Sequence, residues 1–123
     1  MKVSYAAITV KDLEESVKFY TEILGLKEVR RFSPHERMTI AFLKGEGNGM
    51  IELIEGMDKS EWKIDSGQAL LLVGLEVSDM DATVQALWGK GIDFTRGPIE
   101  VQGGTKIAFL KDPNGVGIEL IQP

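Results

Sequence analysis

Cysteine is absent from this sequence, and histidine occurs once, at His35. Without cysteine there are no disulfides, no thiolate metal ligands and no cysteine nucleophile. No apolar run approaches the ~18 residues of a membrane span. The first residues hold one lysine and then an apolar run too short for a signal peptide. We therefore expect a cytoplasmic protein.

Blocks of basic residues are also missing, and the formal net charge is −5. This charge argues against a nucleic-acid partner and mildly favours cationic ligands, and the lack of a long apolar run leads us to expect no membrane partner. The chain has 123 residues, of which 43% are hydrophobic and 27% are charged. These values are ordinary for a single globular domain, and we expect one domain over residues 1–123.

An internal repeat is the strongest positive signal in the sequence. Residues 40–55 read IAFLKGEGNGMIELIE, and residues 107–122 read IAFLKDPNGVGIELIQ, with nine of the sixteen aligned positions identical. Each segment has two β-prone runs around a turn rich in Gly and Asn, which is typical of a β-hairpin. A duplicated hairpin indicates a duplicated module.

The same offset of 67 residues extends back through the chain. Asp12 and Asp79 each precede a helical pattern and are expected to cap a helix N-terminus. The apolar stripe of the first predicted helix holds Leu13, Val17, Tyr20 and Leu24. Its first three residues keep this offset and match Met80, Val84 and Leu87 in the second predicted helix. The order in each half is therefore strand, helix and three strands.

The predicted boundaries follow from these patterns and from the turn residues between them. We expect modules at residues 1–56 and 69–123, joined by a connector at 57–68. The predicted strands are 3–10, 26–32, 38–43, 50–55, 70–77, 91–96, 106–110 and 116–121, with loops at 33–36 and 97–98.

Glu52 and Glu119 occupy equivalent positions in the last strands of the two modules. They alternate with apolar residues, so they point to the face opposite the helices if those residues face the helices. Because duplicated modules usually pair about a two-fold axis, we expect the two carboxylates to meet. They either line a binding site or are structural, in contact with solvent or with Arg37 or Lys106.

Two stretches carry a resemblance to a known family: ITVKDLEESVKFYTEILGLKEVRR at residues 8–31 and GGTKIAFLKDPNGVGIELI at residues 103–121. With the tandem βαβββ order, they resemble the vicinal oxygen chelate superfamily, which includes glyoxalase I, bleomycin-resistance proteins and extradiol dioxygenases. The resemblance implies an α+β fold in which two modules form an incomplete barrel around a cleft. It does not choose among the functions that the superfamily supports.

The resemblance also implies where a metal would bind. In metal-dependent members, each module contributes one ligand from its first strand, usually His, and one from its last strand, usually Glu. Glu52 and Glu119 match the last-strand positions, whereas the first-strand positions hold Tyr5 and Leu72. Since Zn²⁺ and Ni²⁺ favour imidazole or thiolate ligands, we expect a degenerate site and no cofactor, with only weak divalent-metal binding at the two glutamates.

The remaining candidates are ligand contacts. Tyr5 offers a hydroxyl to a ligand or is a half-buried strand residue, and Leu72 forms an apolar wall or part of the core. Trp62, in the connector, is a candidate for a ligand or dimer contact. His35 is expected in a solvent-exposed loop.

Three functions are compatible with these observations. The preferred interpretation is a glyoxalase/bleomycin-resistance-like homodimer that binds a small molecule in the cleft between its modules, without a functional glyoxalase-type metal site. The first alternative is a lactoylglutathione-lyase-like lyase or isomerase that uses Glu52 or Glu119 as base or weak metal ligand. The second alternative is a ligand-free interaction module.

Overall fold

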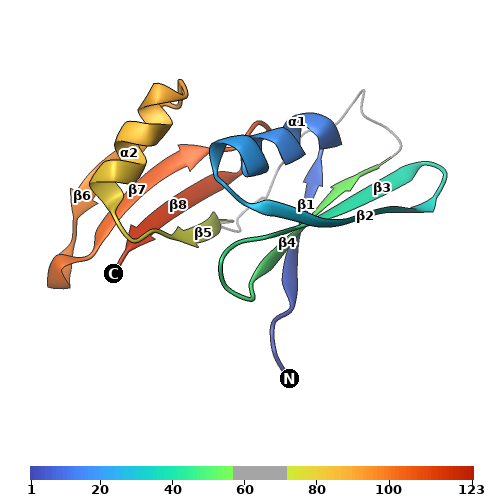
Figure 1. The fold of residues 1–123 in the computed structure, drawn as a ribbon, viewed down its shortest axis with the longest axis horizontal. Helices are drawn as coiled ribbons and strands as arrows, with labels where there is room; N and C mark the ends of the chain where they lie inside the picture. The colour runs from blue at the N-terminus through green and yellow to red at the C-terminus, as the bar shows by residue number, and fades with distance from the viewer. Residues whose placement is uncertain (57–71) are drawn as a thin grey trace. The chain divides into compact units, whose positions relative to one another are not determined.

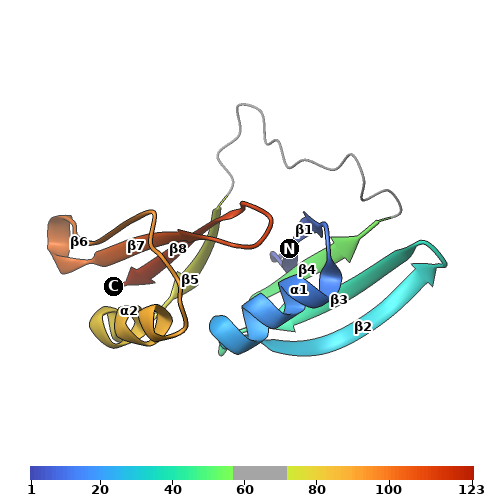
Figure 2. The same ribbon diagram turned by 90° about the horizontal axis from the view of Figure 1, so that it is seen from above.

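The computed structural model describes residues 1–56 and 72–123, so the predicted connector at 57–68 and Trp62 lie outside the described residues. The chain divides into two compact units, Met1–Ile64 and Asp65–Pro123. Each unit is built around one four-stranded mixed sheet with a helix on one face (Figures 1 and 2). This is the predicted α+β fold with two βαβββ modules, whereas the closure of the modules around a shared cleft stays a prediction.

The two units have the same strand order. In the first, the order across the sheet is β1-β4-β3-β2, and in the second it is β5-β8-β7-β6. In each unit the first strand pairs with the last strand in parallel, as β1/β4 and β5/β8. The other neighbouring strands are antiparallel. The first unit contains β1 (Tyr5–Val10), α1 (Leu13–Lys18), the π-helical turn Phe19–Ile23, β2 (Lys27–His35), β3 (Met38–Lys44) and β4 (Met50–Glu55). The second contains β5 (Leu72–Glu76), α2 (Met80–Gly89), β6 (Arg96–Glu100), the 3₁₀ turn Gln102–Gly104, β7 (Lys106–Lys111) and β8 (Gly117–Gln122).

The predicted helix caps form in both units. The Asp12 carboxylate accepts a hydrogen bond from the Glu15 amide at 3.1 Å, and that of Asp79 accepts one from the Ala82 amide at 3.0 Å. These bonds satisfy amides that have no partner within the helix. The residues of the predicted apolar stripes are buried except Leu24, which is partly exposed.

A second cap comes from the far end of each unit. The amide of Leu13, the first residue of α1, donates to Glu55 Oε2 at 2.6 Å, and the amide of Met80 donates to Gln122 Oε1 at 2.6 Å. Glu55 and Gln122 are equivalent in the repeat and end their strands. In each unit, the last residue of the last strand therefore holds the first residue of the helix on one face of the sheet.

Two boundary predictions are wrong, and both concern edge strands. Ser33–His35, predicted as part of a loop, forms the end of β2, where His35 pairs with Met38 and is exposed as expected. The strand predicted at 91–96 does not form over residues 91–95, and Gly97-Pro98, predicted as a break, lies inside β6 at a shift in pairing register. Proline is tolerated at both places because an edge strand has one side without ladder hydrogen bonds.

Gly97 is required at this register shift. Its φ is +81°, and a Cβ added to it would lie 2.7 Å from the Ile107 carbonyl oxygen. Gly91 has the same φ of +81° but no atom within 4 Å of an added Cβ. Replacing each glycine by alanine therefore separates two contributions to the loss of stability. Gly91 reports the backbone conformation alone, and Gly97 reports the conformation and the steric contact together.

We expect Gly97→Ala to lower the free energy of unfolding by about 3 kcal/mol, because it combines a left-handed φ with a clash against backbone. The matched control Gly91→Ala carries only the conformational cost, about 1 kcal/mol. Urea denaturation followed by circular dichroism measures both. Equal losses in the two variants would contradict the assigned contact.

Candidate functional site

The face of each sheet opposite its helix carries the candidate residues. Along β4, Ile51, Leu53 and Glu55 point to the α1 side, as the bond from Glu55 to the start of α1 shows. Because strand residues alternate between faces, Glu52 points to the opposite face. The same alternation in β8 places Glu119 opposite the face from which Gln122 caps α2. We call these surfaces the helix-free faces of the two units.

Four aligned residues form a row across the first helix-free face. Arg30 in β2 pairs with Phe42 in β3, Phe42 pairs with Glu52 in β4, and Glu52 pairs with Ala7 in β1. Glu52 is only 7% exposed, and its neighbours in the row offer a small methyl group and an aromatic ring. A carboxylate therefore sits in largely apolar surroundings.

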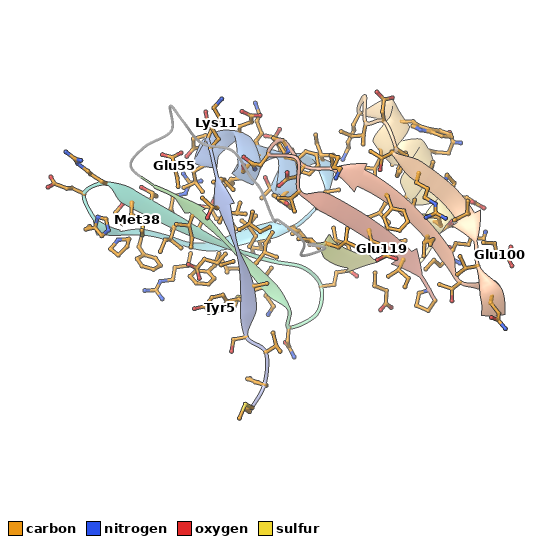
Figure 3. All side chains as sticks on the ribbon, turned by 180° about the vertical axis from the view of Figure 1, so that it is seen from behind. Tyr5, Lys11, Met38, Glu55, Glu100 and Glu119 are labelled. Carbon is orange, nitrogen blue, oxygen red and sulfur yellow. The ribbon has the colours of Figure 1, made fainter. Side chains whose placement is uncertain are left out.

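The second unit repeats the row. Arg96 in β6 pairs with Phe109 in β7, Phe109 with Glu119 in β8, and Glu119 with Gly74 in β5. Glu119 is partly exposed, and Figure 3 labels it on its strand. The sequence repeat identified the glutamates and the phenylalanines, but only the strand register shows that an arginine completes each row.

Aromatic contacts build the surface around Glu52. The Tyr5 and Phe42 rings meet edge to face, with centroids 5.1 Å apart, and Phe32 is stacked 6.4 Å from Phe42. The Arg30 guanidinium carbon lies 4.4 Å from the centre of the Phe32 ring. Such contacts hold the rings in place and leave little polar surface beside the carboxylate.

Glu52 has no protein partner among the described residues. None of the hydrogen bonds or ion pairs within residues 1–56 and 72–123 involves its carboxylate, so the contact with Arg37 weighed above is not formed. The contact between Lys106 and Glu119 is not formed either, because Lys106 pairs with Asp81 at 3.4 Å. The Glu52 carboxylate oxygens therefore remain in contact with solvent, because no described side-chain oxygen is both buried and without a partner.

Tyr5 and Leu72 occupy equivalent places at the start of the edge strands. Tyr5 pairs with Met50 and is 49% exposed, and Leu72 pairs with Gly117 and is 37% exposed. Both side chains belong to the helix-free faces, two residues before the Ala7 and Gly74 ends of the rows. The role of Leu72 as an apolar wall of a ligand site stays a prediction.

A surface hollow lies on the second unit, with a volume of about 210 Å³. The residues around it combine apolar walls with two cations: Leu72, Thr95, Arg96, Phe109, Leu110, Lys111 and Gly117. Lys111 and Phe109 are site residues that no sequence pattern predicted. Their equivalence to Lys44 and Phe42 in the repeated hairpin was the available signal.

The residues at the expected metal positions do not fit a Zn²⁺ or Ni²⁺ site. The Tyr5 ring is packed against Phe42, and Leu72 offers only hydrocarbon. Within residues 1–56 and 72–123, no three side chains from His, Cys, Asp and Glu are grouped as metal ligands would be. Glu52 and Glu119 are the remaining donors, and two carboxylates suit hard cations that keep several waters. Their pairing across the modules stays a prediction.

The architecture and these faces define a class of protein: a two-module α+β protein with an acidic residue on the helix-free face of each sheet. Residues 2–120 match the Glyoxalase/Bleomycin resistance protein/Dioxygenase superfamily, and the chain belongs to this superfamily. The described ranges contain no helix that is both long and apolar enough to cross a membrane.

Named relatives and solved structures are similar over almost the whole chain. A probable lactoylglutathione lyase of Vibrio parahaemolyticus is 39% identical, with 98% of this chain and 90% of the relative covered. The lactoylglutathione lyase of Haemophilus influenzae is 37% identical, with 99% and 93% covered. A variant of Zea mays glyoxalase I is 36% identical with a TM-score of 0.85, and the match covers 98% of this chain but 44% of the maize protein. Leishmania major glyoxalase I is 29% identical with a TM-score of 0.79, with 99% and 86% covered.

We expect weak binding when Ni²⁺ or Zn²⁺ is added to metal-free protein, because two carboxylates without imidazole form a poor site for either ion. Isothermal titration calorimetry measures the affinity, with Glu52→Gln as the comparison. Stoichiometric binding at or below micromolar concentration that is lost in Glu52→Gln would contradict the degenerate site.

Proposed function

We propose that this chain is a lyase or isomerase of glyoxalase type, in which Glu52 acts as the general base. The observation that carries the proposal is the Glu52 side chain, which is 7% exposed, has no hydrogen-bond or ion-pair partner among the described residues and lies on the same sheet face as an aromatic cluster. The similarity to chains named lactoylglutathione lyase supports the reaction class. The substrate class is then a small adduct of a thiol and an α-ketoaldehyde, such as that of glutathione and methylglyoxal.

The reaction moves a proton between adjacent carbons. The Glu52 carboxylate takes the proton from the carbon that bears sulfur and returns it to the neighbouring carbon. The hydroxyl proton of the first carbon passes to the oxygen of the second, so the substrate is isomerised without net oxidation. Phe42 and Phe32 provide apolar surface that limits water beside the base. The Tyr5 hydroxyl is the donor we assign to the substrate oxygen on which charge develops.

The hollow on the second unit suits an anionic end of the substrate. Arg96 and Lys111 place two positive charges beside Phe109 and Leu72. The net charge of −5 favours cationic ligands, but the two cations of this hollow favour an anionic group. The local charge decides, because nearby groups dominate recognition of a bound carboxylate.

We expect Glu52→Gln to lower kcat by about 10²–10⁴-fold, because glutamine keeps the shape of the side chain but cannot accept the proton. Steady-state formation of S-lactoylglutathione from methylglyoxal and glutathione measures the effect. Glu55→Gln is the matched control, since it changes the same strand on the opposite face and Gln122 shows that glutamine fills this capping role. Equal activity of Glu52→Gln and the unchanged protein would contradict the assigned base.

We expect Lys111→Met to raise KM about tenfold with kcat little changed, because a lost charged contact weakens substrate and transition-state binding alike. Lys106→Met is the control: it removes a lysine of the same strand that pairs with Asp81 instead of lining the hollow. A fall in kcat at unchanged KM would assign Lys111 to another role.

The second candidate function is binding of a small molecule without chemistry. The hydrocarbon side chain of Leu72 in place of an imidazole favours it. An unchanged protein that binds an S-substituted glutathione in calorimetry but never turns over the adduct would select this function over the first. Pairing of two chains as a homodimer stays a prediction under both.

A further inference from the structure

The two hairpin turns of the repeat both contain the dipeptide Asn-Gly. Asn48-Gly49 lies between β3 and β4, and Asn114-Gly115 lies between β7 and β8. Asparagine is thermolabile, most of all before glycine, because no side chain on the next residue obstructs attack on the amide. The structures of the two turns are different, and this difference has a chemical consequence.

The second turn is held by a buried aspartate. Asp112 is 5% exposed, and its Oδ1 accepts hydrogen bonds from the amides of Asn114 and Val116, each at 2.8 Å. The Asn114 side-chain amide lies 3.4 Å from Asp112 Oδ2, and the Gly115 amide donates to the Asp112 carbonyl at 3.1 Å. Both reacting groups of this Asn-Gly pair are therefore engaged.

The first turn has no equivalent of this aspartate. All residues from Gly45 to Gly49 are exposed, and no atom lies within 4 Å of a Cβ added at Gly47 or Gly49. Among the described backbone hydrogen bonds of turns and loops, none is donated by Gly49. Among the described residues, Gly49 and Asn48 thus lack the hydrogen bonds that engage Gly115 and Asn114, and both are exposed to water.

We propose that Asn48 is a site of spontaneous deamidation in the folded protein and that Asn114 is protected. The Gly49 backbone nitrogen attacks the Asn48 side-chain carbonyl carbon, a new C–N bond closes a succinimide ring, and ammonia leaves. Water then opens the ring at either carbonyl and gives aspartate or isoaspartate. No oxidation or reduction occurs, and water is the only co-reactant.

The product changes the hairpin that leads into β4. It adds one negative charge, and the isoaspartyl form lengthens the main chain by one methylene beside the Lys44 and Met50 pair. Glu52 follows Met50 by two residues, so the modified turn adjoins the strand that carries it.

The test is a time course of the full chain in mildly alkaline buffer at physiological temperature, followed by peptide mapping with fragmentation that separates aspartate from isoaspartate. The hydrogen bonds on Asn114 and Gly115 together stabilise that turn by about 1–2 kcal/mol, so Asn48 is expected to react about 5–30-fold faster than Asn114. In denaturant the two rates should converge, because only the folded state protects Asn114. Equal rates in the folded protein, or faster reaction at Asn114, would overturn the proposal.

Two variants test the assignment. Gly49→Ala should slow the loss of the Asn48 amide and leave Asn114 unchanged, because a Cβ obstructs the attacking nitrogen while open space around Gly49 tolerates it. Asn48→Gln should remove the first product altogether. Circular dichroism of each variant checks the fold, and unchanged reaction at position 48 in Gly49→Ala would refute the cyclic route.

Discussion

The alternation of strand residues between two sheet faces is the constraint on which the rest of the structure depends. In β4 it sends Glu55 to the start of α1 and Glu52 to the other face, and in β8 it sends Gln122 to the start of α2 and Glu119 to the other face. A shift of one residue in the strand register would exchange these roles and turn the apolar residues of the strand toward water. The pairing register of β4 therefore determines both the position of the helix cap, Glu55, and that of the proposed base, Glu52.

Duplication explains why the two units share the same row of residues. The side chains around the row now differ between the units. The row of Arg, Phe, Glu and a small residue is present in both sheets. Around Glu52 the neighbours are aromatic, whereas the surface hollow of the second unit has two cations beside it. The proposed roles differ accordingly: Glu52 is the proposed base in the first unit, and Arg96 and Lys111 are the proposed contacts for an anionic group in the second.

The turns of the repeated hairpin show the same divergence on a smaller scale. Asp112 binds the amides of its own turn and is buried by it, whereas the glycine-rich turn at 45–49 has no side chain in that role. The strands that flank the two turns pair in the same register in both hairpins. The turns themselves differ in their hydrogen bonds. Local hydrogen bonding, and not the dipeptide itself, then sets the chemical lifetime of each asparagine.

The sequence alone determined the module order, the two helix caps, most of the apolar stripes and the equivalent strand positions of Glu52 and Glu119, because each rests on local periodicity or on a repeat that preserves spacing. It failed at Ser33–His35 and at Gly97-Pro98, where proline predicted a loop or a break. Tertiary structure decided those cases, since an edge strand leaves one side without ladder bonds and so accepts proline. It also decided which arginine joins each row and where Lys111 lies, because these contacts depend on pairing between strands far apart in the chain, which no local pattern encodes.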